Sequence, residues 1–327
     1  MKHKWTRLAA ALVLALLAGC AGGRTAQGQP FIERVSLEEV ELEDEAVALS
    51  SSPAALANDL TPVASGKSVS KNSKATVDYS NAKDGYVMIR FTAKSDRRLK
   101  AKITGPSGGK GYQYNLTQGQ WETFPLSDGN GKYEVKVYEH TGKDSKYAVV
   151  LTVSFQVTMA DEFAPFIRPN QYVNYAVKAD NTLKKAEELI GNETDALIKV
   201  ERVYDFVVSN LTYDKQKAKT VQSGYLPVLD DVLEKKTGIC FDYAALMTAM
   251  LRSQDVPCKL VVGYAGTAYH AWINVWSEET GWVDNAIYFD GEAWQRMDPT
   301  FASSSNSSEA IMKYIGDGSN YSALYFY

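Results

Sequence analysis

The segment Gly238-Ile239-Cys240-Phe241-Asp242-Tyr243-Ala244 decides how the rest of the chain is interpreted. Thr237 and Gly238 interrupt one helical pattern, and a new helical pattern runs from Cys240 to about Ser253. The first residues of a helix have unpaired N–H groups and lie at the positive end of the helix dipole, which favours a thiolate. The spacing therefore predicts a reactive cysteine in the first turn of a helix.

Two residues farther along the chain have the types that such a cysteine needs. His270 opens a predicted strand over residues 271–276, and Asp298 ends another over residues 294–297. An aspartate that accepts one imidazole N–H fixes the tautomer of the ring and leaves the other nitrogen for the thiol. The order Cys240, His270, Asp298 therefore predicts a nucleophilic triad.

Each member of this triad also has an ordinary structural explanation. The cysteine could be a small buried residue, the histidine a hydrogen-bonded core residue and the aspartate part of a turn. Their joint occurrence in this order favours the triad. Asp284 and Asp290 are alternatives to Asp298, but both lie in segments that are typical of turns.

The elements around these residues predict an α+β domain over residues 161–327. Apolar residues at helical spacing predict amphipathic helices, and strands follow them. Helices followed by antiparallel strands indicate the α+β class. The predicted elements are helices over residues 195–211, 227–235 and 240–253 and strands over residues 259–264, 271–276 and 294–297.

Residues 75–160 have a different pattern, which predicts a small all-β domain. Apolar and polar residues alternate over 99–103 and 133–137, and turn-rich clusters separate these runs. Several short strands with such turns indicate a β-sandwich. A longer run is predicted to place five residues on one face, namely Val149, Leu151, Val153, Phe155 and Val157.

The N-terminal residues have the order of a bacterial lipoprotein signal. A basic start precedes an apolar run over residues 8–17, which is too short to span a bilayer. The run ends in Leu17-Ala18-Gly19-Cys20, which resembles the lipobox, where the cysteine is acylated. Residues 1–19 are therefore predicted to be a signal peptide, Cys20 the lipidation site, and the small, polar and acidic residues 20–74 a disordered tether.

Composition and cysteine count exclude several classes of protein. Lys and Arg number 35 against 39 Asp and Glu, a net charge of -4, so nucleic acid is not an expected partner. Three cysteines exclude a disulfide framework, and no zinc-ligand spacing is present. Cys258 follows the far end of the predicted helix, roughly 20 Å from Cys240, whereas disulfide-bonded Cα atoms lie within about 7 Å. It is interpreted as a buried, inert strand residue.

The segments around the triad resemble the transglutaminase-like superfamily. Besides the opening segment, the matching residues are Val262-Gly263-Tyr264, His270-Ala271-Trp272, Trp282 and Met297-Asp298-Pro299-Thr300. The resemblance covers about residues 196–303. It implies a papain-like fold with Cys240 as nucleophile, His270 as general base and acid, and Asp298 as the residue that orients the histidine.

Three residues near the nucleophile are candidates for supporting roles. The backbone N–H of Cys240 is the expected oxyanion donor, and the Tyr213 hydroxyl is a candidate second donor. Asp242 and Tyr243 are expected to position the helix start and line the cleft. No metal or organic cofactor is implied.

The sequence as a whole predicts a lipid-anchored enzyme on the outer side of a cell membrane. Its expected substrates are amide bonds of peptides or proteins in the cell envelope, attacked by Cys240 and resolved by water or by an amine. The superfamily includes amide crosslinkers, peptidases, deglycosylating amidases and members without known activity. The alternative is therefore a non-catalytic binding or scaffolding lipoprotein that retains the fold.

Overall fold

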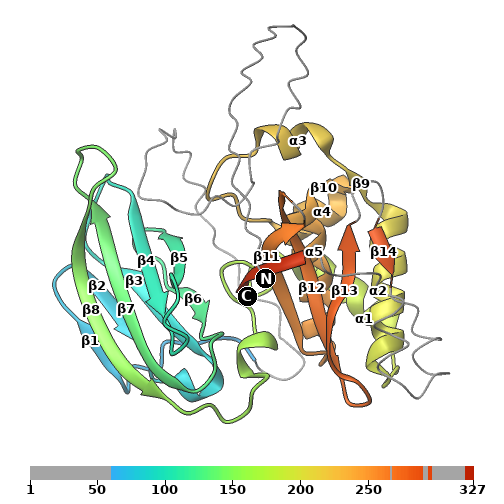
Figure 1. Ribbon diagram of the computed structural model, residues 1–327, viewed down its shortest axis with the longest axis horizontal. Helices are drawn as coiled ribbons and strands as arrows, with labels where there is room; N and C mark the ends of the chain where they lie inside the picture. Colours follow the sequence, from blue (N-terminus) through green and yellow to red (C-terminus); the bar gives the residue numbers. More distant parts are fainter. Residues whose placement is uncertain (1–59, 266, 290–293, 297–320) are drawn as a thin grey trace, which may run out of the picture.

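The computed structural model describes residues 60–265, 267–289, 294–296 and 321–327. Figure 1 shows two halves side by side, a strand-rich N-terminal half in blue to green and a second half in which helices pack on another sheet. This arrangement confirms the predicted α+β class with a strand-rich region ahead of it. Cys20, Asp290 and Asp298 lie outside the described residues.

Two four-stranded antiparallel sheets make up the strand-rich half, in the orders β1-β2-β3-β6 and β5-β4-β7-β8. The alternation predicted over residues 99–103 is present, because Leu99, Ala101 and Ile103 are buried and the residues between them are not. The strands are β1 (Val69–Lys71), β2 (Ala75–Asp78), β3 (Tyr86–Phe91), β4 (Leu99–Thr104), β5 (Tyr112–Leu116), β6 (Glu122–Pro125), β7 (Gly131–His140) and β8 (Tyr147–Val157).

Two details differ from the sequence predictions for this half. Strand β1 begins at Val69, inside the segment that was expected to be a tether, and pairs with β2. Val149 is 55% exposed, although it was predicted to share a buried face with Val153. The pairing of β7 with β8 shifts register beside Val137, and the extra residue turns the start of β8 to the other face.

The second half is built around one helix that is buried on all sides. Every residue of α5 (Cys240–Arg252) is buried, and the helix packs against β11 and β12 and against α1, α2 and α4. Its start at Cys240 confirms the predicted position. The other helices are α1 (Asp180–Ile190), α2 (Ala196–Asn210), α3 (Lys215–Thr220) and α4 (Leu229–Lys235), with short 3-10 turns at η1 (Ala82–Asp84) and η2 (Ala164–Phe166).

The sheet of this half has the order β14-β13-β12-β11-β15, with antiparallel neighbours. The strands are β11 (Cys258–Ala265), β12 (Ala268–Ser277), β13 (Gly281–Phe289), β14 (Trp294–Arg296) and β15 (Tyr321–Phe326), and β9 (Thr212–Tyr213) with β10 (Thr237–Gly238) forms a separate parallel pair. The sequence analysis placed β11, β12 and β14 but did not identify α1, α3, β13 or β15. Neither of the two missed strands shows a period-two pattern that would separate it from a loop.

Aromatic rings join the two halves. Tyr112 and Tyr114 of β5 lie edge-on to Tyr327, with ring centroids 5.7 Å and 6.0 Å from it. Tyr172, from the segment between the halves, stacks on Tyr327 at 4.0 Å and lies 5.6 Å from the ring of Phe241. The strand-rich half therefore packs, through this cluster, on the residue that follows Cys240.

A buried cation adds a second connection. The Arg252 guanidinium, 1% exposed, donates to the backbone carbonyls of Cys258 (2.8 Å), Arg168 (2.7 Å) and Tyr327 (2.6 Å). These carbonyls belong to the start of β11, the segment between the halves and the residue that follows β15. One side chain thus fixes three separate segments at the end of α5 away from Cys240.

Candidate active site around Cys240

Cys240 is the first residue of α5 and is 3% exposed. The backbone of Ala271 and of Phe241 and the hydroxyl of Tyr213 are near enough to the sulfur to lower the pKa of the thiol. Tyr213, which the sequence analysis named as a second oxyanion donor, therefore lies beside the thiol of Cys240.

His270 lies in β12 and pairs across the sheet with Gly263 of β11. It is 6% exposed, and its ring lies against that of Trp272 at a centroid distance of 6.3 Å. The backbone of Ala271, the next residue, is near enough to Cys240 to lower the pKa of its thiol, so β12 brings the histidine toward the start of α5. Two predicted triad members are thus on adjoining elements.

Burial sets the protonation of both residues. It raises the pKa of Cys240 to about 12, against the lowering effect of the N–H donors and of Tyr213, and the charge of Asp242 raises it further. Burial also lowers the pKa of His270 to about 4. Burial thus favours a neutral thiol and a neutral imidazole.

This result reverses one sequence prediction. The position at a helix start was expected to lower the pKa of Cys240, and its N–H donors do act in that direction. Their effect is smaller than the cost of placing a thiolate among buried groups. The neutral imidazole can accept a proton, so this arrangement suits proton transfer from the thiol during attack rather than a preformed ion pair.

The third member of the predicted triad, Asp298, is outside the described part of the chain, as is its alternative Asp290. Asp284, the other alternative, was expected in a turn but lies in β13. Its carboxylate accepts from the side-chain amide of Asn274 at 2.6 Å, in the same strand as His270 and four residues after it. The carboxylate is thereby engaged in joining β12 to β13.

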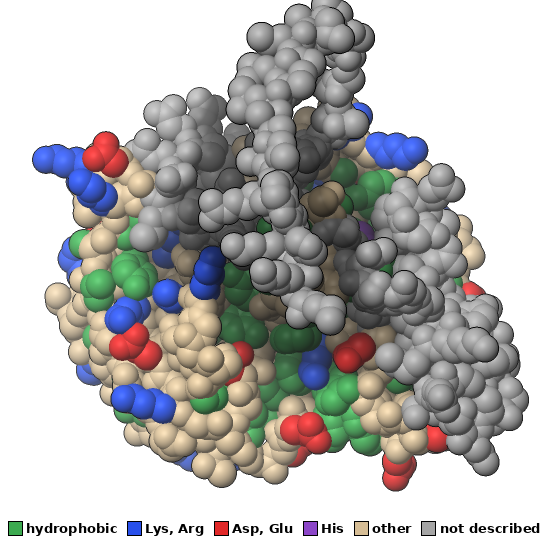
Figure 2. All heavy atoms as spheres, viewed as in Figure 1, with side chains coloured by type: hydrophobic (Ala, Val, Ile, Leu, Met, Phe, Trp, Pro, Cys, Tyr) green, Lys and Arg blue, Asp and Glu red, His purple; other side chains and the backbone are tan. Residues whose placement is uncertain are grey.

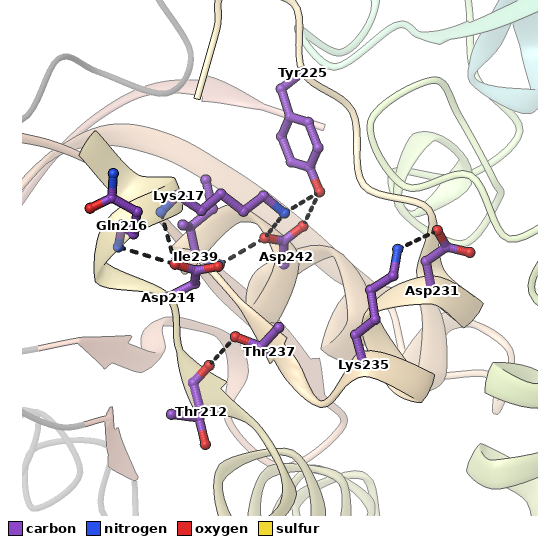
Figure 3. Close-up of polar contacts among 10 residues, drawn as sticks. All are labelled: Thr212, Asp214, Gln216, Lys217, Tyr225, Asp231, Lys235, Thr237, Ile239 and Asp242. Carbon is purple, nitrogen blue, oxygen red and sulfur yellow. Dashed lines mark hydrogen bonds and ion pairs between the residues drawn. The ribbon is translucent and has the colours of Figure 1, made fainter. Parts of the chain in front are cut away.

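Asp242 organises the first turn of α5, as Figure 3 shows. The carboxylate is completely buried. Its three donors are the Ile239 N–H (2.7 Å), Lys217 Nζ (2.8 Å) and the Tyr225 hydroxyl (2.5 Å). The bond to the Ile239 N–H satisfies a donor that the helix itself leaves unpaired. The expected positioning role of Asp242 therefore has a definite structural basis.

Gly238 is required by this position of Asp242. A Cβ atom on residue 238 would lie 2.6 Å from the Cβ of Asp242 and 3.0 Å from its Oδ2. Any side chain there would push the carboxylate off the start of the helix. The spacing of Gly238, Cys240 and Asp242 is thus one packing unit, in which the glycine makes room for the residue that closes the first turn.

A short segment delivers the remaining side chains to the same place. Strand β9 pairs with β10 directly before Cys240, and the N–H of Asp214 donates to the Gly238 carbonyl at 2.8 Å. The Asp214 carboxylate caps α3, which carries Lys217. The segment 212–225, here called the α3 wall, therefore brings Tyr213 beside the thiol. It also places Lys217 on Asp242, as Figure 3 shows.

Lys217 and Tyr225 were missed by the sequence analysis. Lys217 stands among other lysines in an exposed-looking stretch, and nothing in that pattern distinguishes it from a solvated residue. Tyr243, which was named, is buried with its ring 6.3 Å from that of Tyr213. Within the residues that the structure describes, no group of three His, Cys, Asp or Glu side chains could hold a metal ion.

The matching family is the transglutaminase-like superfamily, whose model aligns with residues 184–299 and so spans Cys240 and His270. Residues 184–299 are a transglutaminase-like domain. Among curated proteins, an uncharacterized protein of Bacillus subtilis is 28% identical over 104 residues, which cover 26% of this chain and 14% of that protein. A protein-glutamine gamma-glutamyltransferase of Pseudomonas aeruginosa is 31% identical over 70 residues, 17% of this chain and 10% of that protein.

Solved structures are also similar to this chain. A candidate cysteine protease from Cytophaga hutchinsonii has 16% identity and a TM-score of 0.33, with 61% of this chain and 69% of that chain covered. Red sea bream transglutaminase has 15% identity and a TM-score of 0.26, with 69% and 49% covered. The segments that match the two curated relatives span only 14% and 10% of the length of those proteins.

Proposed function

We propose that the transglutaminase-like domain is a thiol enzyme that acts on amide bonds of peptides or proteins, with Cys240 as nucleophile. The observation that carries the proposal is the setting of the Cys240 sulfur at the start of α5, where the backbone of Ala271 and Phe241 and the hydroxyl of Tyr213 act to lower the pKa of the thiol. His270 precedes Ala271 in the same strand. A buried structural cysteine needs no such setting. Asp298 is proposed as the residue that orients His270.

The proposed reaction begins with a neutral pair. The Cys240 sulfur attacks the amide carbonyl while its proton passes to His270. The oxyanion that forms is stabilised by the Cys240 N–H and by the hydroxyl of Tyr213, which is near enough to the thiol to lower its pKa. His270 then gives the proton to the departing amine, and a thioester on Cys240 remains.

A second nucleophile completes the cycle. Water attacks the thioester, with His270 taking its proton, and releases a carboxylic acid; a primary amine attacking in the same way gives a new amide. The first outcome is hydrolysis and the second is crosslinking. In both, the thiol is regenerated and no external oxidant or reductant is consumed.

The proposal includes a location. Acylation of Cys20 after removal of residues 1–19 would hold the enzyme on the outer side of a membrane, with peptides or proteins of the cell envelope as substrates. No helix in the described ranges has the length and apolar character of a membrane span. Replacement of Cys20 by Ser tests the anchor, because it should shift the protein from the membrane to the soluble or unprocessed fraction.

The decisive experiment compares the two described cysteines. Burial also raises the pKa of Cys258, to about 11, and its sulfur donates to the Thr248 hydroxyl. Iodoacetamide at neutral pH should alkylate Cys240 well before Cys258 in the folded protein, since Cys240 adjoins the part of β12 that carries His270, the proposed base. His270→Ala should slow the alkylation of Cys240 and leave that of Cys258 unchanged.

Activity then separates an enzyme from a binding protein. Cys240→Ala should abolish turnover of any amide substrate, and Cys258→Ala is the matched control that should retain it. Asp298→Asn should lower the rate and preserve the fold. Equal alkylation of both cysteines, or an active His270→Ala protein, would favour the alternative of a non-catalytic scaffolding lipoprotein.

A further inference from the structure

A pocket of about 380 Å³ lies between the two halves of the molecule, apart from the residues around Cys240. Its walls are the turn 127–130 of the strand-rich half, the connecting segment 159–166, and Lys259 and Trp282 of the second half. Figure 2 shows hydrophobic side chains gathered in the hollow between the two halves on one face of the molecule. Small-molecule binding sites have volumes of this size, and they occur preferentially at the boundary between domains.

Lys259 gives the pocket a cation with unused hydrogen-bonding capacity. Its Nζ lies 3.5 Å from the ring centroid of Trp282, 5.0 Å from that of Phe166 and 5.7 Å from that of Phe326. No hydrogen bond or ion pair joins this ammonium to any residue that the structure describes. The aromatic faces attract the positive charge, but they are not conventional hydrogen-bond acceptors for the three N–H groups of the ammonium.

A second polar group in the pocket wall is also unsatisfied. The Oγ of Ser127 is buried and has no hydrogen-bond partner within the described part of the chain. Buried polar atoms are nearly always paired, so an orphan beside a pocket indicates a missing acceptor or donor. The neighbouring Asp128 is already engaged, since its carboxylate accepts from the Ser107 hydroxyl at 2.6 Å.

The rim of the pocket has the opposite charge. Asp161 and Glu162 of the connecting segment are exposed there. Burial lowers the pKa of Lys259, and the charge of Asp284 and, to a smaller extent, that of Glu162 raise it. A simple anion would meet these carboxylates, and a simple cation would meet Lys259. A ligand that carries both charges satisfies both ends.

We propose that this pocket binds a small zwitterionic ligand of the amino acid or dipeptide class. Its carboxylate accepts from Lys259 Nζ and from the Ser127 hydroxyl, and its ammonium group faces Asp161 and Glu162. The rings of Phe166 and Trp282 provide an apolar wall for a side chain. Because the pocket includes neither Cys240 nor His270, the proposal stands or falls independently of the thiol chemistry.

The test is a titration of the full-length protein with the dipeptide Ala-Leu, followed by calorimetry. Two capped forms serve as probes of each charge: Ala-Leu amide lacks the carboxylate, and acetyl-Ala-Leu lacks the ammonium group. Each capped form should bind at least about tenfold more weakly, the loss expected for one charge-assisted interaction. Inorganic phosphate, which carries only negative charge, should not compete.

Variants assign the two ends of the ligand. Lys259→Met keeps the aliphatic stem among the rings and should lower the affinity for Ala-Leu to that for its amide. Glu162→Gln changes an exposed residue that the fold does not need, and it should reduce the preference for Ala-Leu over acetyl-Ala-Leu. Lys235→Met, at an exposed lysine of α4 outside the pocket, is the control and should bind as the unaltered protein does.

Three results would overturn the proposal. They are no heat of binding up to millimolar Ala-Leu, equal affinity for the free and the two capped dipeptides, or unchanged selectivity in both the Lys259→Met and the Glu162→Gln proteins. The Glu162→Gln protein keeps the test informative if Lys259→Met does not fold.

Discussion

Lys217→Met tests whether the buried carboxylate beside Cys240 depends on its cation. The Lys217 ammonium lies 2.8 Å from the Asp242 carboxylate, which is completely buried, whereas the lysine side chain is 28% exposed. Methionine keeps the aliphatic stem and removes the charge. Asp242 then retains its bonds from Tyr225 and from the Ile239 N–H, but no cation among the described residues pairs with its charge.

The expected loss of stability follows from this one-sided burial. Removing one partner of a buried ion pair costs about 3–5 kcal/mol, and exposed pairs contribute about 1 kcal/mol or less. Because Lys217 is partly solvated and two other donors remain on Asp242, we expect a decrease of about 2–3 kcal/mol in the free energy of unfolding. Urea unfolding followed by circular dichroism measures it.

A second readout comes from the thiol. The charge of Asp242 raises the pKa of Cys240, so removal of the compensating cation should raise it further. The pH at which iodoacetamide alkylation of Cys240 accelerates should therefore be higher in the Lys217→Met protein than in the unaltered protein. Asp242→Asn combined with Lys217→Met should return the profile toward its original position.

A matched control lies in the same view. Lys235 pairs with Asp231 at 2.9 Å on the exposed side of α4, with side chains 64% and 51% exposed (Figure 3). Lys235→Met should change the free energy of unfolding by no more than about 0.5 kcal/mol. The reasoning would be refuted if Lys217→Met were as stable as this control and showed an unshifted alkylation profile.

Three further predictions concern packing and charge. Gly238→Ala should lower the free energy of unfolding by about 1–3 kcal/mol because its Cβ overlaps Asp242, whereas Gly109→Ala, which adds a Cβ in open space, should be close to neutral in the same urea titration. Burial raises the pKa of Glu122 to about 7 from an ordinary 4.5, so the folded state binds this proton more tightly than the unfolded chain. The associated stability is present below about pH 4.5 and is lost as the pH rises to about 7, by no more than about 3 kcal/mol, and Glu122→Gln should flatten the dependence of the melting temperature on pH over this window. Tyr327→Ala should cost about 3 kcal/mol or more, and calorimetry should show both halves of the molecule melting together at a lower temperature; melting of only one half would contradict the packing described for the aromatic cluster.

The sequence predicted those parts of the fold that local spacing determines. Helix α2 begins after Asp195, whose carboxylate accepts from the Leu197 and Ile198 N–H groups, and that cap is visible in the sequence. Strands β11 and β12 were also identified, because their apolar content and flanking turns are local features. Strand β15 was not, since its pairing with β11 joins residues about sixty positions apart.

The candidate site shows the same division. Cys240, His270 and Asp242 could be found because they lie in short motifs, and Tyr213 could be proposed from its place before Asp214. Lys217 could not, because only the fold of the α3 wall brings its ammonium to a carboxylate 25 positions later.

The direction of the Cys240 pKa shift was predicted wrongly for a related reason. A helix start can be recognised in a sequence and its N–H donors counted, but the extent to which neighbouring segments exclude water from the sulfur cannot. The property of the site that the sequence did not predict is therefore the exclusion of water from the Cys240 sulfur.

The complete burial of α5 sets where this domain can be altered by protein engineering. All 13 residues of the helix face packed side chains, so a library of substitutions along it would sample mostly unfolded proteins. Helix α3 has no buried residue, yet it belongs to the wall that supplies Tyr213 and Lys217 to the same site. Residues of α3 and its loop should therefore tolerate substitution and are also close to the thiol. Directed evolution of a new selectivity should target these residues rather than the helix that begins with Cys240.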